Sequence, residues 1–147
     1  MNEILAKRGL IAAGAMNVGG VLLFSRGFTN PAIPAADPVV MSNFGLLMIV
    51  IWGLAYWAAT SVISRIKWIA GVFAIEKLIY GVVWIAWLMQ NDLAALYATD
   101  RFAGVFFTIY GLNDLGFMVF FGWLFFAKST LPSGGGRRID DESRSSC

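Results

Sequence analysis

Apolar residues dominate four long stretches of this chain, at about residues 9–25, 39–63, 68–89 and 103–127, and short polar connections separate them. Each stretch has about the ~17–25 residues that a membrane-spanning helix requires. The pattern predicts an all-α fold, an integral membrane four-helix bundle with short loops. We assign residues 1–131 to this four-span transmembrane domain.

Composition supports the same class. Hydrophobic residues make up 59% of the 147 residues and charged residues only 14%, whereas soluble domains carry about 25% charged residues. The chain therefore has too little polar surface to cover itself in water. We expect a multi-pass membrane protein whose first partner is the lipid bilayer.

The connections between the stretches differ in character. Residues 26–38 contain three prolines and are expected to form an ordered, extended cap rather than a helix. Residues 90–101 are expected to hold a short interfacial helix, and residues 64–67 are so short that the second and third spans become antiparallel neighbours. Residues 132–147 are rich in Gly, Ser and charge, which predicts a disordered cytoplasmic tail.

Basic residues are distributed unequally over the two sides of the predicted bundle. Eight flank the spans on one side and two on the other, so the positive-inside rule places both the N and the C terminus in the cytoplasm. The compact chain and short loops favour a bacterial inner (plasma) membrane. The larger group is Lys7, Arg8, Arg65, Lys67, Lys128, Arg137, Arg138 and Arg144, and the smaller is Arg26 and Arg101.

Tryptophan and tyrosine lie near the ends of the predicted spans. Trp68 and Trp123 are near the inner ends, and Trp84, Trp87 and Tyr97 are toward the outer ends. Such positions are typical of the aromatic belts at the two membrane interfaces.

Polar side chains interrupt all four apolar stretches at a similar depth. Asn17, Tyr56 and Glu76 each lie nine residues from the nearest basic flank, which is about 13 Å along a helix axis. Asn113 and Asp114 lie about 20 Å along theirs. In a hydrocarbon core about 30 Å thick, all of these positions fall around the middle. The spacing predicts one polar layer to which every span contributes.

The third and fourth spans carry related patterns that run in opposite directions. Residues 76–80 read Glu-Lys-Leu-Ile-Tyr, and residues 110–114 read Tyr-Gly-Leu-Asn-Asp. Because the two helices are antiparallel, Tyr80 and Tyr110 each lie about one turn to the outer side of their polar pair. We expect these two faces, polar at mid-depth and aromatic along the same arcs, to turn toward each other. The aromatic members are Phe73, Trp84 and Trp87 on one helix and Phe106, Phe117 and Phe121 on the other.

Energetics favour pairing of the charges inside the bundle. A lone charge at a helix centre costs about 2.5–3.5 kcal/mol on insertion scales, so Glu76, Lys77 and Asp114 should face inward. Lys77 can pair fully with one carboxylate only. We expect a Lys77–Asp114 pair beside a protonated Glu76, although the sequence leaves the choice between the two acids open. The expected hydrogen-bond partners of Glu76 are Asn17, Tyr56 or Asn113.

The layer forms the candidate ligand-binding or proton-handling site. The alternative is that its members only join helices, as many polar residues in spans do. For Asn17 alone this alternative is favoured, because Gly9, Ala13 and Gly20 indicate a close helix seam beside it. Together the eight candidates are Glu76, Lys77, Asp114, Asn113, Tyr80, Tyr110, Asn17 and Tyr56.

Missing residue types exclude several kinds of chemistry. The chain has no histidine, which removes bis-histidine haem ligation, histidine metal sites and Ser-His or Cys-His catalysis. The single cysteine, Cys147, cannot form a disulfide within one chain. We predict no metal site and no resident cofactor. The basic tail residues alternate with acidic ones, so nucleic-acid binding has no support.

Three functions are compatible with these patterns. In the first, the polar layer binds or conducts a small molecule or a proton. The expected partners are further copies of this chain in an oligomer, and a lipid or quinone is the expected kind of ligand. In the second, the chain is a non-catalytic accessory subunit that packs against other membrane subunits through lipid-side residues such as Phe107, Phe120 and Phe126.

The third function is a membrane enzyme for a lipid-soluble substrate. Glu76 or Asp114 would act as the acid–base group and Lys77 as the electrophilic partner. Nothing in the sequence requires catalysis, so the binding or transport module ranks first and the enzyme last.

Overall fold

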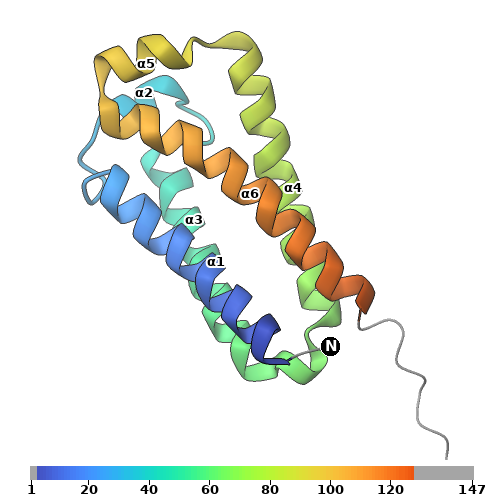
Figure 1. The fold of residues 1–147 in the computed structure, drawn as a ribbon. Helices are drawn as coiled ribbons and strands as arrows, with labels where there is room; N and C mark the ends of the chain where they lie inside the picture. Colours follow the sequence, from blue (N-terminus) through green and yellow to red (C-terminus); the bar gives the residue numbers. More distant parts are fainter. Residues whose placement is uncertain (1–2, 128–147) are drawn as a thin grey trace, which may run out of the picture.

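A computed structural model describes residues 3–127, and six α-helices follow one another in this part of the chain (Figure 1), which contains no strand. The helices are α1 (Glu3–Phe24), α2 (Ala32–Ala36), α3 (Asn43–Ala59), α4 (Lys67–Gln90), α5 (Leu93–Thr99) and α6 (Arg101–Ala127), and the 3-10 helix η1 (Thr60–Arg65) follows α3. The predicted tail at 132–147 lies outside the described residues.

Three segments are long and apolar enough to cross a membrane: Asn43–Arg65, Lys67–Gln90 and Arg101–Ala127. The shortest of the three has 23 residues, about 34 Å as a helix against a hydrocarbon core of about 30 Å. The length and apolar character of these three segments support the prediction that this is a membrane protein. Helix α1 covers the first predicted span, but it is not among the three, because charged residues occupy its first turns and Asn17 and four glycines lower its apolar content. A fourth span stays a prediction.

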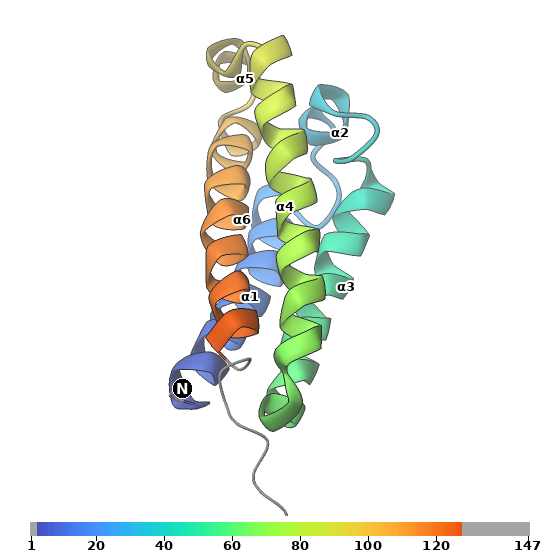
Figure 2. The same ribbon diagram turned by 90° about the vertical axis from the view of Figure 1, so that its right-hand side faces the viewer.

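The four longest helices run lengthwise and pack most closely as two pairs, α1 with α3 and α4 with α6 (Figures 1 and 2). Small residues allow this approach: a side chain on Gly14 would meet the Trp57 ring and the Gly53 carbonyl, and one on Gly111 would meet the Trp84 ring. Helices α3 and α4 are antiparallel as predicted, although their backbones approach less closely than those within each pair. The start of α1, the end of α6 and η1 lie at one end of the molecule.

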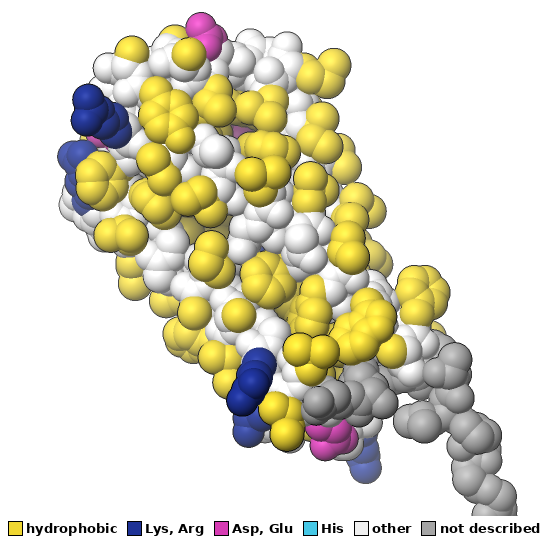
Figure 3. Space-filling model, in the orientation of Figure 1, with side chains coloured by type: hydrophobic (Ala, Val, Ile, Leu, Met, Phe, Trp, Pro, Cys, Tyr) yellow, Lys and Arg dark blue, Asp and Glu magenta, His cyan; other side chains and the backbone are white. Residues whose placement is uncertain are grey.

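Charged side chains gather at the two ends of the face shown in Figure 3, and apolar side chains cover the length between them. Many large apolar residues on the long helices are exposed, including Ile75, Ile79, Leu112 and Val119. An apolar girdle with charged ends is the surface that a bilayer requires.

Buried apolar side chains form two clusters, one toward α2 and α5 and one toward η1. We name the cluster toward α2 and α5 the outer cluster, after the predicted orientation, and it includes Trp84 and Phe107. The cluster toward η1 is the inner cluster, and it includes Tyr56 and Phe73. The predicted aromatic faces of α4 and α6 do meet, since the rings of Phe73 and Phe121 lie 5.3 Å apart. Asn17, Glu76, Lys77 and Asp114 fall between the two clusters along their helices, whereas Tyr56 and Tyr110 belong to the clusters themselves.

Two tryptophans and one phenylalanine of the outer helix ends are buried, and for the phenylalanine this corrects the prediction. Trp84 and Trp87 are buried, and their indole N–H groups donate to the carbonyl oxygens of Phe107 (2.6 Å) and Ala36 (2.9 Å). Both side chains therefore face the interior, as expected from the inward-facing aromatic arc of α4, and the interfacial belt stays a prediction. Phe107 was expected on the lipid side but is 0% exposed, with its ring 4.3 Å from that of Trp87. Helix α6 is covered by α1, α4 and α5, so its buried arc is wider than one pairwise contact would give.

The three-proline connection contains a short helix, α2, which corrects the expected extended cap. Pro31 caps this helix and Pro34 lies in its first turn. Backbone N–H groups in the first turn have no acceptor within the helix, so a proline there costs no hydrogen bond. The side-chain oxygen of Asn30 accepts a hydrogen bond from the Ala32 N–H at 3.0 Å. The short helix expected in residues 90–101 is confirmed as α5.

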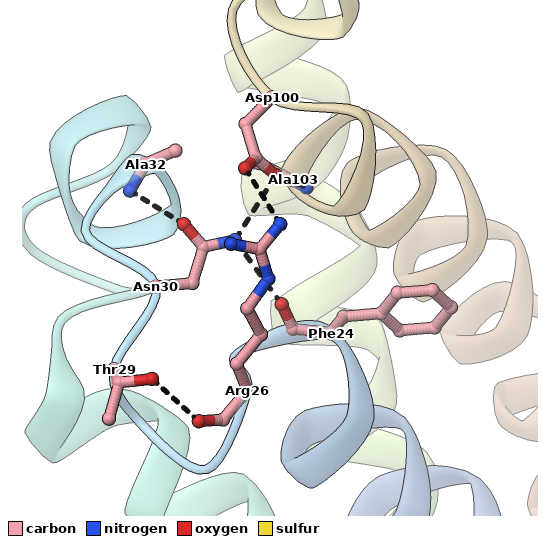
Figure 4. A network of polar contacts seen from close by, with 7 residues as sticks. All are labelled: Phe24, Arg26, Thr29, Asn30, Ala32, Asp100 and Ala103. Carbon is pink, nitrogen blue, oxygen red and sulfur yellow. Dashed lines mark hydrogen bonds and ion pairs between the residues drawn. The ribbon is translucent and has the colours of Figure 1, made fainter.

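A polar network fastens the α1–α2 turn to the start of α6 (Figure 4). The Asp100 carboxylate accepts from the Ala103 N–H (2.7 Å) and from the Asn30 amide (3.1 Å), and it pairs with Arg26 (3.3 Å). The Ala103 hydrogen bond, followed by those from Asn30 and the charge of Arg26, lowers the pKa of Asp100 below its ordinary value. Arg26 and Phe28, on either side of Gly27, both have positive φ, a conformation that is costly for residues with a side chain and that these contacts hold in place.

Candidate functional site

The centre of the polar layer is an ion pair between α4 and α6. The Lys77 Nζ donates to Asp114 Oδ1 at 2.6 Å and to Asn17 Oδ1 at 3.0 Å. Lys77 is only 1% exposed. Of the two pairings that the sequence allows, the structure therefore has Lys77 with Asp114, as expected. The ammonium group also lies 5.4 Å from the centre of the Tyr56 ring, which is within the range of a cation–π attraction.

Glu76 turns to a different partner. The Tyr56 hydroxyl on α3 donates to Glu76 Oε2 at 2.5 Å, one of the partners expected from the sequence. The other carboxyl oxygen, Oε1, is buried without a hydrogen bond among residues 3–127. It lies 3.9 Å from Lys77 Nζ, which is close enough for electrostatic attraction but too long for a hydrogen bond.

The two amides extend the layer to α1 and to the surface of α6. Asn17 donates from Nδ2 to the Ile49 carbonyl of α3 at 3.1 Å while its oxygen accepts from Lys77. Asn113 donates to Asp114 Oδ1 at 3.2 Å. Six of the eight candidates are thus linked in two neighbouring groups, and the four longest helices all contribute.

The remaining two candidates, Tyr80 and Tyr110, lie beside this network without joining its hydrogen bonds. Tyr110 is buried, and its hydroxyl has no hydrogen-bond partner in the described part of the chain. Its ring packs edge-on against Trp84 at 6.5 Å. Tyr80 is half-buried and packs against the outer cluster.

A small pocket of about 40 Å³ reaches the layer between α1 and α6. Polar side chains from Asn17, Tyr110, Asn113 and Asp114 line part of it. The rest of the wall is formed by Gly20 and by the apolar residues Met16, Val21, Phe24, Ile49, Phe106 and Ile109. Apolar walls with a few polar groups are typical of sites for small molecules.

A second groove, of about 280 Å³, reaches Glu76 between α3 and α4. Trp52 and Tyr80 supply aromatic surface, and Val72, Ile75 and Ile79 supply the aliphatic wall. The sequence indicated the polar residues of both openings but not the openings themselves, nor the walls contributed by Gly20 and Trp52. The openings and their walls depend on how far apart the helices of each pair lie, and the spacing of residues along the sequence does not determine that distance.

The two openings differ in charge. Lys77 and Asp114 neutralise each other beside the α1–α6 pocket, whereas Glu76 has no close counter-charge of its own. Within residues 3–127 no cluster of three or more His, Cys, Asp or Glu side chains is placed to hold a metal ion. Comparisons with protein-family models, with curated proteins and with solved structures found no match.

Proposed function

We propose that this protein binds a small, mainly apolar molecule from the bilayer at its polar layer. The α1–α6 pocket carries the proposal, because apolar walls and polar side chains meet in it. Tyr110 contributes a buried hydroxyl that has no partner among residues 3–127, and such a group is costly to bury unless a ligand satisfies it. A carbonyl or hydroxyl oxygen on the ligand would accept this hydrogen bond.

The charges beside the pocket favour a neutral ligand. The Lys77–Asp114 pair is complete at 2.6 Å, so an ionic ligand would have to disrupt a buried salt bridge. A pocket of about 40 Å³ has room only for the polar tip of a lipid or a quinone, so the apolar remainder would lie between the helices and the surrounding acyl chains.

The proposed setting is a four-helix bundle that spans a bacterial inner membrane with both termini in the cytoplasm. Lys7, Arg8, Arg65 and Lys67 belong to the segments that meet at one end of the molecule, which supports this orientation through the positive-inside rule. Passage of a molecule across the membrane would require several copies, because the pocket in one copy is small.

Gly20 provides the test. It lines the pocket, and a side chain added there meets no atom within 4 Å, so Gly20→Leu should fill the pocket without disturbing the helices. Gly19→Leu is the matched control, since Gly19 is equally open but does not line the pocket. Native mass spectrometry of protein extracted from its source membrane should show a small-molecule adduct that only Gly20→Leu loses.

Two outcomes would contradict the proposal. An adduct retained equally by both variants would place the ligand elsewhere. Stable co-purifying proteins without any adduct would instead favour the accessory-subunit function.

A further inference from the structure

The polar layer contains one more acid than base. Lys77 is the one cationic side chain of the layer, and it lies 2.6 Å from Asp114 but 3.9 Å from Glu76. The lysine is therefore committed to Asp114. Glu76 is 6% exposed, and a carboxylate at this depth requires a proton or another cation.

Among the residues that the structure describes, the groups that face Glu76 supply no second positive charge. Tyr56 of α3 donates one hydrogen bond to it. On its own helix Lys77 and Tyr80 are nearest, and Asp114 of α6 is already paired. Helix α1 contributes only Asn17, which is bonded to Lys77. The oxygen Oε1, which accepts no hydrogen bond within the described part of the chain, belongs to the acid that Lys77 approaches only to 3.9 Å.

Glu76 also lines the α3–α4 groove, on a different helix pair from the α1–α6 pocket. Aromatic faces such as those of Trp52 and Tyr80 attract organic cations. The aliphatic residues Val72, Ile75 and Ile79 line the groove with apolar surface. An acid, two aromatic rings and an apolar wall are the features that recognise a hydrophobic monocation.

We propose that Glu76 is an exchange site at which a hydrophobic organic cation, entering from the bilayer through the α3–α4 groove, replaces the carboxyl proton. The O–H bond of Glu76 breaks, the proton leaves to water, and the cation becomes the counter-ion of the carboxylate. One positive charge leaves as one enters, so the layer stays neutral. This site is separate from the neutral-ligand pocket proposed above.

Labelling with dicyclohexylcarbodiimide tests the proton-bearing state. This apolar reagent adds a protonated carboxyl group across its C=N bond and needs no other reactant. We expect labelling at Glu76, located by peptide mass spectrometry, to be slowed by tetraphenylphosphonium and by rising pH.

Binding of tetraphenylphosphonium to purified protein tests the exchange. Because one proton leaves per cation bound, the apparent Kd should fall by up to tenfold for each pH unit while Glu76 is protonated. Glu76→Gln, whose amide oxygen can still accept from Tyr56, should weaken binding at least tenfold and abolish the pH dependence. Cation binding that is equal in Glu76→Gln, or Glu76 labelling unaffected by the cation, would overturn the proposal.

Two further variants guard against a loss of folding. Ile79 is 57% exposed and lines the groove, so Ile79→Lys should weaken cation binding because the added positive charge repels the cation. Ile85→Lys, outside the groove on the same helix, should not weaken it. Gly20→Leu separates the two proposals because it fills the other pocket. Cation binding that persists in Gly20→Leu supports the Glu76 site whether or not the α1–α6 pocket holds a ligand, and its loss there contradicts that site.

Discussion

Replacing Lys77 by methionine should destabilise the protein strongly, because it removes the base that joins three helices. The change deletes hydrogen bonds of 2.6 Å to Asp114 and 3.0 Å to Asn17. At an effective dielectric constant of about 20, the gross attraction over 2.6 Å is about 6 kcal/mol, most of which offsets desolvation. The main cost of the substitution is the Asp114 carboxylate, which is left buried without its partner. We expect the free energy of unfolding to fall by about 3–5 kcal/mol.

The double variant Lys77→Met/Asp114→Leu should recover part of that loss, since it leaves no unpaired carboxylate at position 114. Unfolding by increasing the mole fraction of SDS in mixed micelles, followed by circular dichroism, measures each free energy. Lys67→Met is the control, because Lys67 lies at the start of α4 with its ammonium 5.0 Å from the centre of the Trp68 ring, and its loss should cost less than about 1 kcal/mol. A cost below about 1 kcal/mol for Lys77→Met, or strictly additive effects in the double variant, would refute this reasoning.

Two other predictions concern packing and the outer end. Gly111→Ala should lower stability by about 1–3 kcal/mol because its methyl group would meet the Trp84 ring, whereas Gly116→Ala, which meets nothing, should be neutral or stabilising in the same SDS unfolding series. Asp100→Asn should lose the Arg26 ion pair. Because the pKa of Asp100 is lowered in the folded protein, its contribution is complete at neutral pH and disappears as the pH falls through that lowered value. Thermal unfolding at successive pH values should show this acid-range loss in the wild type and not in Asp100→Asn.

The sequence predicted those features that depend on distance along a helix. Equal spacing from basic flanks located the layer that contains Asn17, Tyr56 and Glu76, and the limit of one full partner per lysine anticipated a pair such as Lys77–Asp114. These inferences need only the helical rise and the cost of an unpaired charge in a membrane. The layer was therefore predictable without knowing how the helices pack.

Features that depend on packing were not predictable in this way. Periodicity gives the direction in which the buried face of a helix points, but not how much of the helix circumference is buried. On α6 the buried arc is wide enough to include Phe107 as well as its neighbour Phe106. Prolines generally disfavour a helix, so their presence in residues 26–38 did not predict α2, although Pro31 and Pro34 both lie at its start, where proline is tolerated. Both grooves likewise follow from the separation of helices, which Gly20 and Trp52 do not reveal from their positions in the sequence.

The Lys77–Asp114 pair has a consequence for how this chain is made. Its members are 37 residues apart, so the ribosome completes α4 before it has synthesised the acid that neutralises Lys77. Until then Glu76 and Lys77 are adjacent ionisable groups on α4 without Asp114. Of the hydrogen-bond partners that the structure gives them, Asn17 and Tyr56 have already been synthesised. Helix α4 should therefore stay against α1 and α3, or beside the insertion machinery, until α6 follows. From this order of synthesis we expect α6, which brings Asp114, to be the helix that allows α4 to enter the lipid.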